Sequence, residues 1–134
     1  MILARLALAS LGLIQAITGN AQSVANVCSA IDGASVVTED GDFLGRITNR
    51  YASDSIFNSY GTYGSQYSSN SVWNNYGSYG SKYSSTSARS PYASSPPLII
   101  KNRRIIGRLT VNRNIVGAIN PIVLGAACYD YAPE

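Results

Sequence analysis

The chain of 134 residues contains no histidine. Histidine is the most common general base in enzymes, the usual partner of a catalytic serine or cysteine, and a frequent metal ligand. Its absence excludes a serine–histidine triad, a cysteine–histidine pair and a zinc site built on histidine. We predict no catalytic residue, no metal ligand and no cofactor-binding residue.

Charged residues are also scarce, at 13% of the chain, and the formal net charge is only +3. So small a surplus does not indicate nucleic-acid binding, which requires a dense basic surface. The basic residues late in the chain are interpreted as a solvated strand face rather than an anion site. They are Lys101, Arg103, Arg104, Arg108 and Arg113.

No apolar run is long enough to cross a membrane. The mainly apolar residues 6–17 follow a positively charged start and precede small residues, which is the pattern of a secretory signal peptide. We expect cleavage after Ala21 or after Ala25. The mature chain, residues 26–134, would then be one domain, secreted or periplasmic, without a transmembrane segment. A buried N-terminal helix and lipidation of Cys28 are the alternatives.

Only two cysteines are present, Cys28 and Cys128. Because an exported protein meets oxidising conditions, a disulfide between them is expected, closing almost the whole mature chain into one loop. The alternative is two free thiols, one of them catalytic, but no histidine is available to activate a thiol.

The centre of the chain is instead rich in tyrosine, serine, glycine and asparagine. Residues 51–97 hold three copies of a sixteen-residue unit, "YASDSIFNSYGTYGSQ", "YSSNSVWNNYGSYGSK" and a degenerate third copy that reaches Pro96–Pro97. An apolar pair recurs in the first two copies, as Ile56–Phe57 and Val72–Trp73. Disordered tracts keep a composition without keeping register, so this regularity predicts ordered, stacked units.

Each unit is expected to contain a single turn of helix. Asp54 and Asn70 are suitable N-caps for "SIFN" and "SVWN", and the following Tyr-Gly supplies a helix stop. The apolar pairs would then point into the core, while the tyrosines pack with their polar ends in water.

The two segments that flank the repeats resemble each other. Residues 36–48, "VVTEDGDFLGRIT", align without gaps on residues 98–110, "LIIKNRRIIGRLT". Both predict a strand, a turn and a second strand, with a strong hairpin signal at Asp40–Gly41 and a weaker one at Asn102–Arg103. Gly45 and Gly107 fall inside the second strands, where glycine indicates a bulge or the close approach of another backbone.

We therefore predict a single small domain, mainly β with short helical turns. Two related β-hairpins flank the three-copy repeat array and are expected to pair into one antiparallel sheet, followed by one more strand. The residues expected to be buried on one side of this sheet are Val36, Phe43, Ile47, Ile99, Ile105 and Leu109.

The repeat segment resembles an uncharacterised group of small exported bacterial proteins. Their hallmark is "DSIFN-x-YG-x-YGS-x-YS", repeated two or three times, followed by proline pairs and a "G-x-LT-x-N" strand. Here the similarity runs through "DSIFNSYGTYGSQYS", "SVWNNYGSYGSKYS", "SPYASSPP" and "IGRLTVN". The chain departs at Arg89–Ser90, where an aromatic or apolar residue and an asparagine would fit, so the packing of the third copy is not predicted. The resemblance implies export and ordered structure, and it brings no reaction or substrate.

The tyrosines are the feature with binding potential, and we expect a non-enzymatic structural or binding module. The sequence leaves the ligand or partner unknown. Aromatic faces and amides suit sugar rings and their hydroxyls, so a cell-envelope glycan is one candidate partner and a surface protein is another. The favoured interpretation is that these rings form the core of a small domain with few aliphatic residues, and binding is the alternative. The candidate ligand-binding residues are Tyr60, Tyr63, Tyr76, Tyr79, Asn58 and Asn74.

Two other functions remain open on the sequence. A small hydrolase would use the carboxylates of Asp40, Asp42 or Asp54, although Glu39, Asp40 and Asp42 at a hairpin tip are typical of a solvated acidic turn. A self-associating matrix protein would be built on the polar and aromatic tract itself.

Overall fold

The computed structural model describes residues 23–133. The described residues divide into two units, with the boundary between Ala30 and Ile31. Residues 23–31 are helical, and the predicted signal peptide lies outside the described residues except for residues 23–25. Within the described part of the chain, no helix is long and apolar enough to cross a membrane.

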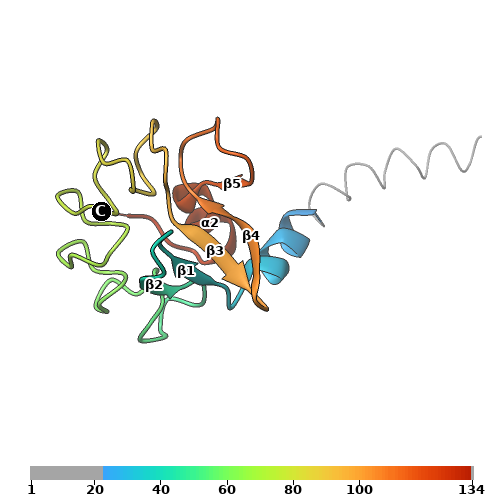
Figure 1. Ribbon diagram of the computed structural model, residues 1–134. Coiled ribbons are helices and arrows are strands. Elements are labelled where there is room, and N and C mark those ends of the chain that lie inside the picture. The colour runs from blue at the N-terminus through green and yellow to red at the C-terminus, as the bar shows by residue number, and fades with distance from the viewer. Residues whose placement is uncertain (1–22, 134) are drawn as a thin grey trace, which may run out of the picture. The chain divides into compact units, whose positions relative to one another are not determined.

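Five strands of the second unit form one sheet in the order β2-β1-β3-β4-β5 (Figure 1). They are β1 (Ser35–Val37), β2 (Phe43–Arg46), β3 (Leu98–Lys101), β4 (Arg104–Leu109) and β5 (Ala118–Ile119). β1 pairs antiparallel with both β2 and β3, so the segments before and after the repeats meet inside the sheet. The single sheet is confirmed. The four strands from the two flanking segments pair antiparallel, and β5, for which no orientation was predicted, lies parallel to β4, so the sheet is mixed.

The chain reverses by different means between β1 and β2 and between β3 and β4. After β1, Gly41 donates its N–H to the carbonyl oxygen of Thr38 at 2.9 Å and takes a φ of 92°. After β3, Asn102 and Arg103 both have positive φ, at 53° and 64°, the pattern of a two-residue type I′ turn. The pair with the weaker sequence signal thus makes the tighter turn, with two non-glycine residues in the left-handed region.

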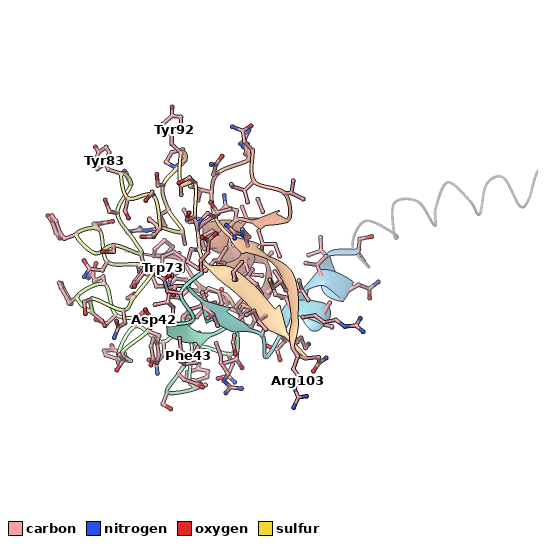
Figure 2. All side chains as sticks on the ribbon, viewed as in Figure 1. Asp42, Phe43, Trp73, Tyr83, Tyr92 and Arg103 are labelled. Carbon is pink, nitrogen blue, oxygen red and sulfur yellow. The ribbon has the colours of Figure 1, made fainter. Side chains whose placement is uncertain are left out.

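We expect Arg103→Gly to raise the free energy of unfolding by about 0.5–1 kcal/mol. The left-handed conformation costs a non-glycine residue roughly 1–2 kcal/mol, and the greater freedom of glycine in the unfolded chain offsets part of that gain. Arg103 is exposed at the turn (Figure 2), so little packing is lost. Urea denaturation measures the difference. Arg113→Gly, at an exposed residue without positive φ, is the control and should not stabilise.

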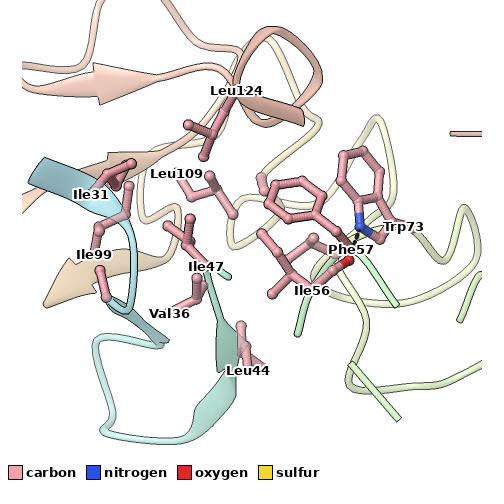
Figure 3. Packing of buried hydrophobic residues seen from close by; sticks show 13 residues of the cluster. Ile31, Val36, Leu44, Ile47, Ile56, Phe57, Trp73, Ile99, Leu109 and Leu124 are labelled. Atoms are coloured by element: carbon pink, nitrogen blue, oxygen red, sulfur yellow. Dashed lines mark hydrogen bonds between the residues drawn. The ribbon is translucent and has the colours of Figure 1, made fainter. Parts of the chain in front are cut away.

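The core gathers side chains from the sheet, the repeats and the C-terminal helix (Figure 3). The predictions for Val36, Ile47, Ile99 and Leu109 are confirmed, since each is fully buried. The predictions for Phe43 and Ile105 are wrong, because these side chains are 40% and 63% exposed.

A shift of register explains the exposure of Ile105. Ile99 pairs with Gly107, but its neighbour Ile100 pairs with Ile105, so β4 carries one extra residue between the two pairs. Simple alternation would place Ile105 on the same face as Gly107, and the bulge cancels that relation. Phe43 lies opposite Val37 instead of Val36 and packs edge-on against Tyr63, with ring centroids 5.1 Å apart.

The repeats form successive β-turns, and the predicted single turns of helix are wrong. In this segment a backbone N–H bonds to the carbonyl oxygen three residues earlier, and successive bonds advance in steps of three. Serine and asparagine side chains at the turn starts accept the N–H two residues later, which favours turns over helix. The donors are Ala52, Ser55, Asn58, Gly61 and Gly64 in the first copy, and Ser68, Ser71, Asn74, Gly77 and Gly80 in the second.

The apolar pairs of the first two copies and the equivalent alanine of the third are buried. Ile56 and Val72 have no exposed surface, Phe57 and Trp73 are 1% and 3% exposed, and Ala88 of the third copy is fully buried. The indole Nε1 of Trp73 donates to the carbonyl oxygen of Ile56 at 2.6 Å, which ties the second copy to the first (Figure 3). All three copies therefore contribute to one core.

Backbone hydrogen bonds attach both ends of the repeat array to the sheet segments. Arg46 in β2 donates to Asp54 at 2.8 Å and accepts from Ile56 at 2.9 Å. Just after β4, Val111 donates to Ala88 at 2.9 Å. Figure 1 shows the copies as a series of loops beside the sheet. The array is thus held at its first and its last copy.

The close approach predicted at both strand glycines is confirmed. A Cβ on Gly45, whose φ is 107°, would lie 2.6 Å from the side-chain Cβ of Tyr63 and 3.0 Å from the backbone carbonyl oxygen of Asp54, both in the first repeat. A Cβ on Gly107 would lie 2.8 Å from the carbonyl oxygen of Gly117. Each glycine leaves room for a neighbouring segment of backbone.

A C-terminal helix, α2 (Pro121–Cys128), was not predicted. Its N-cap is Asn120, whose side chain accepts from the N–H groups of Ile122 and Val123 at 2.9 and 3.3 Å. An asparagine followed by proline is a recognisable helix start. The last residue of the helix, Cys128, is disulfide-bonded to Cys28, which confirms the predicted disulfide.

Candidate binding surface

Six tyrosines project into solvent from the repeats. Each copy supplies two, at its first and tenth positions, and their exposed fractions lie between 83% and 100%. Figure 2 shows Tyr83 and Tyr92 at the outer ends of their loops. Rings this exposed add little to packing, so their apolar faces are free to contact a ligand. The six are Tyr51, Tyr60, Tyr67, Tyr76, Tyr83 and Tyr92.

The same local bond holds the backbone of every exposed tyrosine. Its N–H donates to the side-chain oxygen of the serine or asparagine two residues earlier, as from Tyr60 to Asn58 and from Tyr76 to Asn74, both at 3.0 Å. The corresponding acceptors for the other four are Asn49, Ser65, Ser81 and Ser90. Each ring therefore starts from a fixed backbone position, which lowers the entropy lost on binding.

An open groove of about 900 Å³ lies against the first copy, and three of the exposed tyrosines line it. Tyr51, Tyr60 and Tyr67 contribute the exposed rings, and Trp73 and Tyr131 also line it, with their centroids 5.1 Å apart. Polar lining comes from Asn58, Ser59, Ser65 and Gln66. The groove thus combines several aromatic faces with neutral hydrogen-bonding groups.

The charges in this groove largely compensate each other. Arg50 donates to the carbonyl oxygen of Asp130 at 2.8 Å, and its guanidinium lies 3.9 Å from the Asp130 carboxylate. The same guanidinium lies 5.8 Å from the ring centroid of Tyr51. A strongly charged ligand would find no excess of opposite charge here.

The structure separates the candidate residues that the sequence grouped together. Tyr60 and Tyr76 are fully exposed, whereas Tyr63 and Tyr79 are half-buried. Each half-buried tyrosine follows a glycine by two residues, Gly61 or Gly77, and glycine has no side chain to bind the tyrosine N–H.

Asn58 and Asn74 have internal partners for both ends of their amides. Each Nδ2 donates to a carbonyl oxygen six residues earlier, of Ala52 and of Ser68, at 3.1 and 3.0 Å. Each Oδ1 accepts from the tyrosine two residues later. These amides therefore shape the turns that present the tyrosines. That any of these residues binds a ligand stays a prediction.

The third copy packs through Arg89, at the position of Phe57 and Trp73 in the other copies. Its guanidinium lies 5.7 Å from the Trp73 ring centroid. It donates to the carbonyl oxygens of Trp73 and Gly80 at 3.0 and 3.2 Å, and also to the Asn75 side chain. Burial lowers the pKa of Arg89. Arg89, which stands where the other copies have an aromatic residue, thus packs a hydrogen-bonded cation against the Trp73 ring.

One of the three carboxylates proposed for a hydrolase is held in an ion pair with an arginine. Asp54 is bound by the Arg46 guanidinium through Nε at 2.7 Å and Nη2 at 3.1 Å. Those hydrogen bonds lower the pKa of Asp54, whereas a general acid needs a raised one. Nor does any group of three acidic or cysteine side chains in residues 23–133 offer a metal site.

Sequence reasoning missed four of the six exposed tyrosines and the three-residue step of the turns. The signal was present, because a serine, asparagine, alanine or glycine occupies every third position through the first two copies. Comparisons with family models, with curated proteins and with solved structures give no match for this chain. Function therefore has to follow from the surface of the repeats.

Proposed function

We propose that this protein is an exported, non-enzymatic binding module that recognises cell-envelope glycan through its exposed tyrosines. The groove beside the first repeat is the primary site. The observation that carries the proposal is the set of three tyrosine rings on this groove, Tyr51, Tyr60 and Tyr67, each more than 80% exposed and each held by a side chain in its own turn.

The chemistry of this surface matches carbohydrate. A sugar ring has an apolar face of C–H groups, which packs on an aromatic ring, and a rim of hydroxyls, which needs neutral donors and acceptors. The groove supplies both, through its tyrosines and through Ser59, Ser65 and Gln66. Export is supported by the disulfide between Cys28 and Cys128 and by the apolar N-terminal run in the sequence.

Sedimentation with insoluble peptidoglycan tests this function. We expect the protein without its first 25 residues to pellet with the glycan, and Tyr51→Ala/Tyr60→Ala to reduce the binding constant by about tenfold or more, as loss of aromatic anchors does. Val116→Ala, which alters a 95% exposed side chain outside the repeats, should bind like the unchanged protein. Complete recovery of the unchanged protein in the supernatant would refute glycan binding.

A further inference from the structure

We infer that the ligand is a linear glycan strand that runs along successive repeats, with equivalent groups of residues forming a series of bays. A bay here means the set of side chains that the groove takes from one copy together with the first tyrosine of the next copy. This inference rests on the glycan-binding function proposed above and adds the polymeric nature of the ligand and the number of copies that it contacts.

The tyrosines that line the groove recur sixteen residues further along the chain, whereas the lining from Arg50 and from residues 130–133 lies outside the repeats. Tyr51, Tyr60 and Tyr67 of the first bay correspond to Tyr67, Tyr76 and Tyr83 of the second, and all five rings are exposed. Tyr67 therefore belongs to both bays. Tyr83 and Tyr92 continue the same arrangement into the third copy.

The backbone geometry of the two bays also matches. Asn58 and Asn74 make the same pair of hydrogen bonds, to the carbonyl oxygen six residues earlier and from the tyrosine two residues later. The backbone turns advance identically through both copies. Equivalent backbone bonds place equivalent tyrosines at equivalent positions, so a ligand group that fits one bay fits the next.

Three side chains of the first bay differ in the second, where Phe57 corresponds to Trp73, Ser59 to Asn75 and Gln66 to Lys82. Trp73, which the groove takes from the second copy, corresponds to Arg89. The Arg89 guanidinium turns inward to the carbonyl oxygens of Trp73 and Gly80. Lys82, which is exposed, is thus the one charge that the second bay gains. The series of bays therefore accommodates a neutral or weakly anionic strand.

The surface chemistry selects a glycan over other polymers. Within residues 51–97 every exposed large apolar side chain is a tyrosine, so no aliphatic surface is offered to lipid or to an apolar peptide. A nucleic acid would need a line of cations, and this segment contains only Lys82 and Arg89. Repeated bays increase affinity for a ligand whose own units repeat, because the second contact is made at high effective concentration.

Glycan strands released from peptidoglycan and separated by length provide the test. We expect the association constant, measured by calorimetry, to rise at least about tenfold between a strand that fills one bay and one that fills two. Tyr83→Ala lies outside the first bay. It should abolish most of that rise, and because a one-bay strand can still occupy the first bay, the affinity for such a strand should fall far less than the affinity for a two-bay strand. Tyr67→Ala should weaken both, since the two bays share this ring.

Tyr83→Phe keeps the ring and should retain the length dependence. Thermal melting checks that each variant is folded. Because these rings are exposed, we expect no large loss of stability. Equal affinity at every length, or a Tyr83→Ala protein that binds long strands as well as the unchanged protein does, would overturn the series of bays and leave the single groove in place. Failure of strands of every length to bind would overturn both proposals.

Discussion

Replacing Gly80 with alanine is expected to destabilise the protein by about 3 kcal/mol, because the added methyl group would overlap neighbouring backbone atoms. A Cβ on Gly80 would lie 2.3 Å from the carbonyl oxygen of Asn74 and 2.7 Å from its nitrogen. Both contacts are with backbone, which cannot rotate aside as a side chain would. Asn74 also fixes the turn that holds Tyr76, so the displaced backbone would disturb an exposed tyrosine as well.

Gly77→Ala is the matched control. Gly77 lies in the same copy, and a Cβ there would be no closer than 3.4 Å to any atom, its nearest neighbours all belonging to the Asn74 side chain. We expect a change within about 1 kcal/mol, since the lost freedom of the unfolded chain compensates for slight crowding. Urea denaturation of both variants gives the comparison. Equal losses would show that the backbone contact at Gly80 does not set the cost.

The sixteen-residue period predicted which repeat side chains are buried, but not the local structure that buries them. Ile56, Phe57, Val72 and Trp73 are all in the core, as their regular spacing indicated. The predicted helical turns, which depended on Asp54 and Asn70 as N-caps, are not formed. In the structure the serines one residue later, Ser55 and Ser71, make the deciding bonds, to the N–H groups of Phe57 and Trp73 at 3.0 Å.

The step of three residues also explains why the period is sixteen. Five steps cover fifteen residues, and one further residue resets the phase at Ser65 and at Ser81, whose N–H groups bond four residues back instead of three. A search for periodicity in apolar residues alone does not detect this step, because only one step in each copy carries the apolar pair. The three-residue period is instead visible in the small residues and asparagines that start the turns.

The sequence predicted the residue type of the candidate site, but not which residues line it. Composition pointed to tyrosine, and Tyr60 and Tyr76 are indeed exposed, but Tyr51 and Tyr67 enter the groove only through the fold. The sequence also gave no indication that the C-terminal tail contributes. Tyr131 lines the same groove although it lies far from the repeats in the chain, and long-range contacts of this kind do not follow from local pattern.

Removing the disulfide is expected to have the largest effect on stability. A bond between Cys28 and Cys128 closes a loop of about 100 residues, and the chain-entropy model assigns such a loop roughly 4 to 5 kcal/mol. That is a large part of the 5–15 kcal/mol typical of a domain. We expect Cys28→Ser/Cys128→Ser to lower the melting temperature by about 15 to 30 °C. Reductant should lower the unchanged protein to the same temperature and leave the double variant unaffected.

The same bond should also influence the groove, because the residues that follow Cys128 contribute to it. Tyr129 stacks on Phe57 with ring centroids 4.7 Å apart and donates to Asp32 at 2.7 Å, while burial raises the pKa of Tyr129 and keeps this donor protonated. Tyr131, two residues later, lines the groove. Glycan binding by the reduced protein, measured well below its melting temperature, should therefore be weaker than binding by the oxidised protein. Unchanged affinity after reduction would show that aromatic packing alone holds the tail in place.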